Sequence, residues 1–271
     1  MDSFKKYIKY KSKYINLKSM IKGTHSGTMR AIKFSNDILN NIYWNKIIFS
    51  HGGFIRNVCI KLLGNNYEIF ENNNSFKFKL INKENNLTID IFSGIPKSNL
   101  AICSDDIKLK NEFEKRTSKK DYLYKYIGNG AIIRISLNDQ YLYFVRHFPS
   151  KSNLADVTNK GSKFIYNPDL ISGKCFDVFL KKYKNNFTIF NQSNKNFKNE
   201  INEILKNKIV YTSCLKRTIQ TAKILIYKVI NHQKIIKYCV LEGIHEIGKW
   251  DIANKCPNNT VFACFNLEND M

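Results

Sequence analysis

Three short apolar stretches of the sequence each end in residues that can bind or attack a phosphoryl group. In chain order they are Ile47-Ile-Phe-Ser-His51-Gly52-Gly53, Tyr141-Leu-Tyr-Phe-Val-Arg146-His147 and Ile209-Val-Tyr-Thr-Ser213-Cys-Leu-Lys-Arg217. A guanidinium group is a strong, permanently charged donor to phosphate oxygens. A neutral imidazole, with a free pKa of about 6.5, is a good nucleophile toward phosphorus near neutral pH. The residue types therefore point to phosphoryl chemistry.

Each segment taken alone also has an ordinary structural explanation. A histidine at a strand end is commonly a hydrogen-bonded structural group, and the glycines after His51 fit a simple strand-to-helix turn. Arg217 falls in the first turn of a predicted helix, where its positive charge is repelled by the positive end of the helix dipole. Either a bound anion or solvation of the side chain by water would offset this repulsion. A fourth segment places Glu242 and Glu246 after another strand, and either carboxyl could serve as a general acid.

These residues must be positioned by strands that alternate with amphipathic helices. Apolar residues at helical spacing predict helices over 31–42, 55–63 and 215–229, and Gly64 is predicted to end the second of these. Apolar runs and alternation predict strands over 47–49, 131–137, 141–145, 209–212 and 235–240, and a hairpin over 76–91. The strands over 131–137 and 141–145 are joined at Asn138-Asp139. The Asn- and Lys-rich residues 183–200 indicate an inserted loop, and the charged residues 104–126 a linker or exposed helix. The order predicts a three-layer α/β fold, a mainly parallel sheet with helices on both faces, which binds ligands beyond the strands' carboxyl ends.

Residues 1–22 are predicted to form a separate, basic N-terminal helix. Its apolar stripe comprises Tyr7, Tyr10, Tyr14, Leu17 and Ile21. We expect this helix to dock on the rest of the chain, with binding to a membrane surface as the alternative. The segment resembles the Lys- and Tyr-rich leaders of many proteins of large DNA viruses, which suggests a viral origin.

Composition excludes several classes of protein. The 271 residues are 43% hydrophobic, which excludes disorder throughout, and no apolar run is long enough to span a membrane. The amino-terminal residues lack an apolar signal core, so we expect a cytoplasmic protein, in the host cytoplasm if the protein is viral. Seven cysteines without a CxxC pair indicate reduced thiols and no metal site.

The net charge of +22 has two explanations. An A/T-rich genome enriches Lys, Asn and Ile throughout, whereas a polyanionic partner favours clustered lysines. The lysines are dispersed along the sequence, which favours the first explanation. Because no RNP, zinc or helix-turn-helix signature occurs, we do not expect a nucleic-acid partner. GxSxG and Walker A motifs are also absent, which excludes serine hydrolases of that type and P-loop NTPases.

Together, the four segments resemble the motifs of the histidine phosphatase superfamily, which has the phosphoglycerate mutase-like fold. The matches are Arg146-His147 with Ser150 and Asn153 to the nucleophile motif RHGxSxxN, Ser213-x-Leu-x-Arg217 with Gln220-Thr-Ala222 to the second-arginine motif, Ser50-His51-Gly52-Gly53 with Ile55-Arg56 to the second-histidine motif, and Gly243-Ile-x-Glu246 to the acid-bearing segment. The sequence departs from the first motif at Phe148, where the family has glycine, and at Pro149, which lacks an N–H donor.

The order of the motifs differs from that of the family, because His51 precedes the other three. This is the pattern of a circular permutation, which close surface termini make tolerable. The resemblance thus implies one domain over 23–271. In it, 23–92 correspond to the family's C-terminal part, 93–130 form a linker region, and 131–271 correspond to its N-terminal part.

The resemblance implies a phosphomonoester hydrolase that acts through a phosphohistidine. The implied catalytic residues are His147 as nucleophile, Glu246 as acid, with Glu242 as the alternative, and His51. The implied phosphate-binding groups are Arg146, Arg217, Asn153 and the Gly52 amide. No cofactor or metal is implied, the substrate is a phosphorylated small molecule or phosphoprotein, and the oligomeric state stays open.

Two alternatives accompany this hypothesis. A phosphoglycerate-mutase-type transferase would pass the phosphoryl group to a second hydroxyl instead of water. A non-catalytic phosphate-binding relative would result if Phe148 closed over His147. We expect instead that Phe148 points away from His147 and contacts an apolar part of the substrate.

Overall fold

The computed structural model of the chain describes residues 24–40, 42–71, 78–95, 127–150, 153, 170–213, 215–241, 244 and 264–267. The predicted N-terminal helix at 1–22 and the predicted linker at 104–126 lie outside the described residues, as do Glu242 and Glu246.

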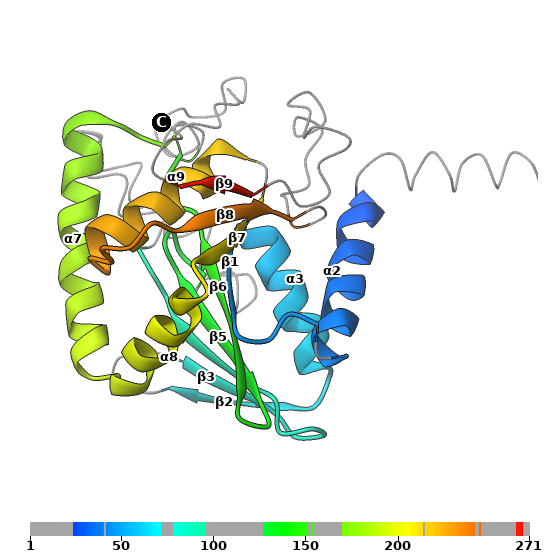
Figure 1. The fold of residues 1–271 in the computed structure, drawn as a ribbon. Helices are drawn as coiled ribbons and strands as arrows, with labels where there is room; N and C mark the ends of the chain where they lie inside the picture. Colours follow the sequence, from blue (N-terminus) through cyan, green and yellow to red (C-terminus); the bar gives the residue numbers. More distant parts are fainter. Residues whose placement is uncertain are drawn as a thin grey trace, which may run out of the picture.

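The described strands form one mixed sheet. They are β1 (Lys46–Ser50), β2 (Tyr67–Glu71), β3 (Phe78–Asn82), β4 (Thr88–Phe92), β5 (Ile132–Leu137), β6 (Gln140–Arg146), β7 (Ile209–Thr212), β8 (Lys237–Val240) and β9 (Cys264–Asn266). Their order across the sheet is β2-β3-β4-β5-β6-β1-β7-β8-β9 (Figure 1). Neighbouring strands from β6 to β8 are parallel, and the five other pairings are antiparallel.

The prediction of a mainly parallel sheet is therefore wrong, although the α/β class is confirmed. Hairpins join β3 to β4 and β5 to β6, and adjacent strands joined by short turns must run antiparallel. The sequence pattern predicted the hairpin over 76–91 and the two strands joined at Asn138-Asp139, but it did not show that they extend the same sheet that carries β1 and β7.

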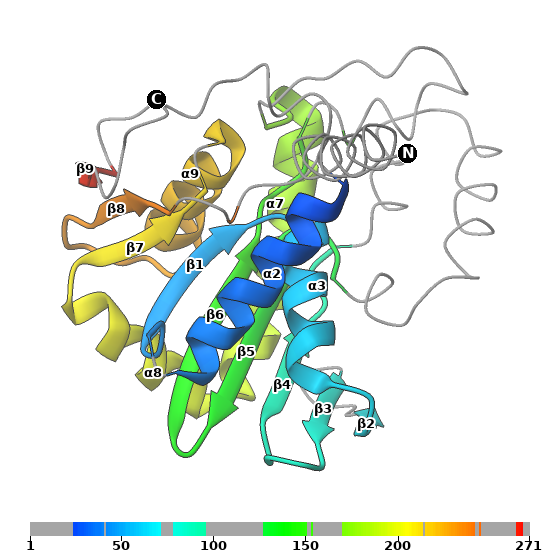
Figure 2. The ribbon, with the colours of Figure 1, turned by 90° about the vertical axis from the view of Figure 1, so that its right-hand side faces the viewer.

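Helices cover both faces of the sheet, as predicted. The described helices are α2 (Thr24–Leu39), α3 (Gly52–Leu63), α7 (Gly173–Gln192), α8 (Lys195–Lys206) and α9 (Lys216–Lys223), which continues as the π-helix η2 (Ile224–Val229). Helices α2 and α3 lie on one face, and α7, α8 and α9 lie on the other (Figure 2). Along β6, Leu142 and Phe144 pack in the core under α2 and α3, whereas Tyr143 and Val145 pack in the core under α7 and α8.

Local predictions succeeded where the signal was local. Gly64, at φ 63°, caps α3, and Asn138 and Asp139 form the tight turn between β5 and β6 with positive φ angles. The inserted loop predicted over 183–200 is wrong, because α7 and α8 occupy these residues. Aromatic residues at helical spacing bury one side of α7: Phe179, Tyr183, Phe187 and Phe190.

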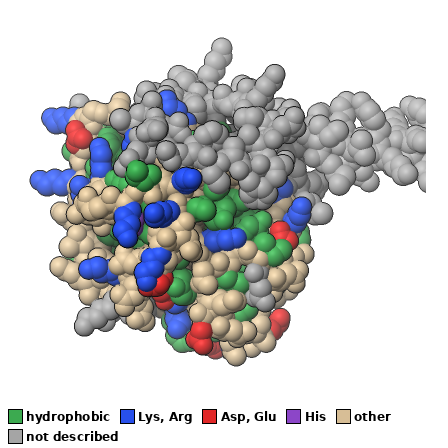
Figure 3. Space-filling view, in the orientation of Figure 1, with side chains coloured by type: hydrophobic (Ala, Val, Ile, Leu, Met, Phe, Trp, Pro, Cys, Tyr) green, Lys and Arg blue, Asp and Glu red, His purple; other side chains and the backbone are tan. Residues whose placement is uncertain are grey.

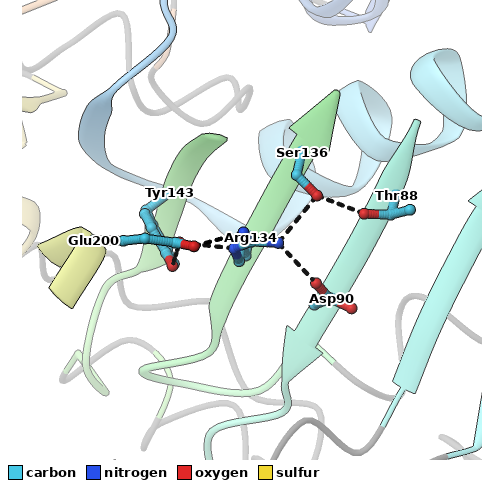
Figure 4. A network of polar contacts seen from close by, with 6 residues as sticks. All are labelled: Thr88, Asp90, Arg134, Ser136, Tyr143 and Glu200. Carbon is cyan, nitrogen blue, oxygen red and sulfur yellow. Dashed lines mark hydrogen bonds and ion pairs between the residues drawn. The ribbon is translucent and has the colours of Figure 1, made fainter. Parts of the chain in front are cut away.

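A polar network ties α8 to the sheet (Figure 4). Arg134 on β5 donates two hydrogen bonds to the carboxylate of Glu200 on α8, over 2.6 and 2.8 Å. The same guanidinium contacts Asp90 on β4 at 3.3 Å, and the Tyr143 hydroxyl also donates to Glu200. Because Arg134 satisfies carboxylates from two elements, the network fixes where α8 sits on its face of the sheet.

Lysine and arginine side chains lie in several separate groups over the face drawn in Figure 3, with few acidic side chains among them. This arrangement agrees with the dispersed lysines of the sequence. No described helix is both long and apolar enough to cross a membrane.

The described cysteines differ in whether their sulfur is a free thiol or part of a disulfide. Cys59 is free and buried on α3, and burial raises the pKa of its thiol to about 12, which makes it a poor nucleophile. Cys175 and Cys239 are each disulfide-bonded, which corrects the expectation of reduced thiols for these two residues. Sequence spacing cannot reveal such pairing, because a disulfide depends on distance in the folded chain.

Candidate functional site

The carboxyl ends of three adjacent parallel strands bring the predicted segments together. Ser50 at the end of β1 lies opposite Arg146 at the end of β6, and Phe49 lies opposite Thr212 of β7. The parallel pairing continues one residue further, because the His147 amide donates to the Ser50 carbonyl over 3.1 Å. His51 and His147 therefore follow neighbouring strands at one edge of the sheet.

His51, His147 and Arg217 form a buried group that we call the histidine cluster. The centroids of the two imidazole rings are 5.1 Å apart. Arg217 Nη2 lies 3.3 Å from His51 Nδ1. The three residues are 0%, 2% and 3% exposed, respectively. The proximity expected for these residues is present, although they are widely separated in the sequence.

A hydrogen bond determines the protonation of the His147 ring. Its Nδ1 lies 2.6 Å from the carbonyl oxygen of Phe148. A carbonyl oxygen only accepts hydrogen bonds, so Nδ1 must carry a proton. In the neutral ring, Nε2 therefore carries the lone pair that a nucleophile needs.

His51 is held in the opposite tautomer. A guanidinium only donates hydrogen bonds, so Nδ1 of His51 accepts from Arg217 and carries no proton. The proton lies on Nε2, which donates to Ser213 Oγ over 2.7 Å. Ser213 Oγ lies 3.0 Å from the hydroxyl of Thr218 on α9. In this arrangement the His51 ring carries a single proton and is neutral.

Two hydroxyl residues that sequence reasoning left without a role organise the cluster. Ser213 holds His51, as described above. Thr221 Oγ1 donates to the Arg217 carbonyl over 2.7 Å and accepts from the Phe148 amide over 2.8 Å, which ties α9 to the loop after β6. Both residues lie inside the quoted second-arginine motif, so a signal for them was present in the sequence.

Arg146 and Gly52 lie in contact with each other. A Cβ atom at Gly52 would come within 2.9 Å of Arg146 Nε and 3.0 Å of its Cζ, so only glycine allows this approach. Nη1 of Arg146 donates to the Ile127 carbonyl. The structure thus brings Arg146 alongside the start of α3, while directing part of its guanidinium to the backbone.

Phe148 does not lie where we expected it. It is 0% exposed, and its ring packs edge-on against Phe179 and Tyr183 of α7, at centroid distances of 5.3 and 4.8 Å. The expected contact with substrate is therefore wrong, because the side chain belongs to the core under α7. Pro149 presents its carbonyl to the Ile171 amide, which pairs this loop with the segment before α7.

Asn153 stabilises its own loop. Its side-chain oxygen accepts from both the amide and the hydroxyl of Ser150, over 3.0 and 3.1 Å. Phosphate binding by Asn153 stays a prediction, since no contact places this residue beside the histidine cluster.

The two candidate acids, Glu242 and Glu246, lie outside the described residues. Ile244, midway between them, is described, and its carbonyl accepts a hydrogen bond from the Ser50 hydroxyl. The backbone at Ile244 therefore lies beside Ser50, the residue that precedes His51.

Backbone amides add further donors at this edge of the sheet. Helix α3 begins at Gly52, directly after His51, and its first internal hydrogen bond is donated by Ile55. Helix α9 begins at Lys216, directly before Arg217. The first amides of a helix lack partners within it and favour anions. Among the described residues, no group of His, Cys, Asp and Glu side chains has the composition of a metal site.

Comparisons of the chain with protein-family models, with curated proteins and with solved structures found no match.

Proposed function

We propose that the protein is a phosphomonoester hydrolase that forms a phosphohistidine on His147. The observation that carries this proposal is the histidine cluster, in which the Phe148 carbonyl keeps the proton of the neutral His147 ring on Nδ1 and the lone pair on Nε2. A buried arginine and a second histidine stand beside this ring. A phosphoryl group bound beside these rings would accept charge-assisted hydrogen bonds from the guanidinium of Arg217.

We also propose that the chain is a circularly permuted relative of the histidine phosphatases, in a single domain over 23–271. Support comes from the four adjacent parallel strands, β6, β1, β7 and β8, which place the three basic motifs at one sheet edge. The strand that carries the second-histidine motif, β1, comes first in the chain and yet lies between the strands of the two other motifs.

The first chemical step transfers the phosphoryl group to the enzyme. His147 Nε2 attacks phosphorus in line, an N–P bond forms and the ester P–O bond breaks. The departing oxygen takes its electron pair and a proton from a carboxylic acid, for which we propose Glu246. The carbonyl of Ile244, two residues before Glu246 in the sequence, accepts a hydrogen bond from Ser50.

The second step regenerates the enzyme. Glu246, now a carboxylate, takes a proton from water, and the water oxygen attacks phosphorus. The N–P bond breaks and its electron pair returns to Nε2, with inorganic phosphate as product. Throughout both steps the Nδ1–H group of His147 stays hydrogen-bonded to the Phe148 carbonyl, so the ring keeps its orientation.

Charge on the transferred group is stabilised by Arg217 and by the first amides of α3 and α9, with Arg146 at the start of α3. His51 positions the guanidinium of Arg217 rather than supplying charge, because Arg217 donates to its Nδ1. The substrate is a phosphorylated small molecule or a phosphoprotein. The buried position of Phe148 counts against the non-catalytic alternative, because that alternative required its ring to close over His147.

Trapping the intermediate tests this proposal. We expect phenyl phosphate to label His147, and an acid-free quench followed by mass spectrometry to find an adduct that is acid-labile and base-stable. His147→Ala should abolish the adduct and lower the turnover number by about 10³-fold or more. His232→Ala is the matched control, because His232 precedes β8 at the opposite end of the sheet. Hydrolysis without an adduct on His147 would contradict the assignment.

A further inference from the structure

Asn129 is a buried residue whose carboxamide makes no hydrogen bond to the described part of the chain. It is 0% exposed, and within the described part of the chain neither the oxygen nor the nitrogen of its carboxamide has a hydrogen-bond partner. Asn82, at 4% exposed, shows the usual arrangement: its nitrogen donates to the Leu62 carbonyl and its oxygen accepts from the Glu84 amide. A buried carboxamide that neither donates nor accepts a hydrogen bond destabilises the fold. We therefore look for a functional role of Asn129.

The backbone places Asn129 next to Gly130, the residue that pairs with His147. Asn129 and Ile95 exchange two backbone hydrogen bonds of 2.9 Å, so their side chains lie on the same face of the sheet. Ile95 belongs to the core under α7, together with Val145 and Phe148, which flank Arg146 and His147 in the sequence. The next residue, Gly130, donates its amide to the His147 carbonyl over 3.3 Å.

Close packing holds this backbone in place. A Cβ atom at Gly128 would lie 2.7 Å from the Ser93 carbonyl oxygen, and one at Gly130 would lie 2.5 Å from the ring of Tyr183. The Tyr183 hydroxyl also donates to the Gly130 carbonyl over 2.9 Å. The carboxamide of Asn129 is therefore presented from a rigid turn, which is how binding groups are preorganised.

The chemistry of the carboxamide identifies what it would bind. Its nitrogen only donates and its oxygen only accepts, so a complementary group must do both. An ionised phosphate ester only accepts, and it would leave the Asn129 oxygen without a partner. A hydroxyl group both donates and accepts, and it therefore satisfies the whole side chain.

We propose that Asn129 recognises a hydroxyl group of the substrate, so that the substrate is a phosphate ester of a polyol or sugar. This inference rests on the proposed phosphatase function and narrows its substrate class. The histidine cluster binds the phosphate, and Asn129 binds a hydroxyl carried near it. Sequence reasoning missed Asn129, for which the flanking glycines Gly128 and Gly130 were the available signal.

A pair of esters that differ in their hydroxyl groups tests the proposal. We expect the wild type to favour glycerol 3-phosphate over n-propyl phosphate by about 100-fold or more in kcat/KM. The reason is that n-propyl phosphate, when bound, has no hydroxyl group to pair with the Asn129 carboxamide. Asn129→Ala and Asn129→Leu should reduce this preference to less than about tenfold, mainly by slowing glycerol 3-phosphate. Asn82→Ala is the matched control, and it should keep the wild-type preference.

Thermal stability gives a second measurement that does not depend on turnover. Without substrate, Asn129→Leu should raise Tm, because it replaces an unpaired buried amide by an apolar group of similar size. Asn82→Leu should lower Tm, because it leaves the Leu62 carbonyl and the Glu84 amide without their partner.

The outcomes separate this inference from the proposed function. Hydrolysis of both esters at similar kcat/KM, or a Tm lowered by Asn129→Leu, overturns the role of Asn129 and leaves the phosphatase standing. Hydrolysis of phenyl phosphate without hydrolysis of either of these esters overturns the polyol or sugar substrate class and leaves the phosphatase standing. If none of the three esters is hydrolysed, the phosphatase proposal fails, and the inference is decided by binding. In that case a larger Tm increase with glycerol 3-phosphate than with n-propyl phosphate, lost in Asn129→Ala, supports it, and equal increases overturn it.

Discussion

At the scale of single residues, the tautomers of His51 and His147 are determined by neighbouring groups that can only donate or only accept a hydrogen bond. The guanidinium of Arg217 can only donate, and the Phe148 carbonyl can only accept. These two constraints place the proton on Nδ1 of His147 and on Nε2 of His51. The two histidines thus take different tautomers, and in the neutral rings only His147 carries its lone pair on Nε2.

Ser213 is the residue whose removal should test this ordering most directly. In Ser213→Ala, Nε2 of His51 loses its acceptor, so His51 should sample both tautomers and Arg217 should lose its fixed position. We expect the turnover number to fall by about tenfold or more with little change in KM, and the unfolding free energy to fall by about 1 kcal/mol. The ¹⁵N chemical shifts of the His51 ring would report the tautomer directly.

The matched control for this test is Ser193→Ala, whose hydroxyl donates to the Ile189 carbonyl at the end of α7. It should change neither the His51 shifts nor the turnover number. A single Nε2-protonated His51 in Ser213→Ala would show that another group fixes the ring.

At the scale of elements, α8 is attached to the sheet by charge as well as by apolar contact. Arg134 makes two hydrogen bonds to Glu200, which leaves Asp90 with a single longer contact. Burial raises the pKa of Asp90 above its ordinary value of 3.8, although the charges of Arg134 and Lys79 act in the opposite direction. The folded protein therefore binds a proton at Asp90 more tightly than the unfolded chain does.

This raised pKa predicts how stability depends on pH. As pH rises from 3.8 through the folded pKa of Asp90, the unfolded chain releases its proton first, and the wild type loses stability. Asp90→Asn cannot titrate, so its unfolding free energy relative to the wild type should increase over this interval and then level off. Urea unfolding of both proteins at a series of pH values measures the difference, in which the other carboxyl groups cancel. A difference that stays constant or falls with pH would show that Arg134 outweighs burial.

At the scale of the whole molecule, one chain supplies every described member of the histidine cluster. The block from β6 to β8 builds the site, and the antiparallel strands β2 to β5 extend the same sheet on one side. Contacts between His51, His147 and Arg217 all form within the chain. The site needs no exchange of β1 between two copies.

Mixing inactive variants tests this arrangement. We expect an equimolar mixture of His51→Ala and His147→Ala proteins, unfolded together and refolded, to show no more phosphatase activity than the two variants measured separately. In a domain-swapped dimer, one site of a mixed pair would combine an intact His51 with an intact His147. Recovered activity would therefore indicate that β1 is exchanged between chains.

The sequence alone was sufficient for features that depend on a few neighbouring residues. An apolar run followed by polar residues predicted β1, β6 and β7 and the residues at their ends. Apolar spacing with a terminal glycine predicted α3 and its end at Gly64, and Asn138-Asp139 predicted the tight turn after β5. The same spacing was available in α7, but the many Asn and Lys residues concealed it.

Only the tertiary structure decided which of these elements meet. It placed β1 between β6 and β7, brought His51 to His147, and joined the hairpins to the same sheet in antiparallel order. It also buried Phe148 against α7, and it buried Asn129 next to Gly130, whose amide pairs with the His147 carbonyl, although the sequence pattern leaves both positions undetermined. The physical reason is that secondary structure responds to neighbours along the chain, whereas burial and strand pairing depend on packing between residues far apart in it.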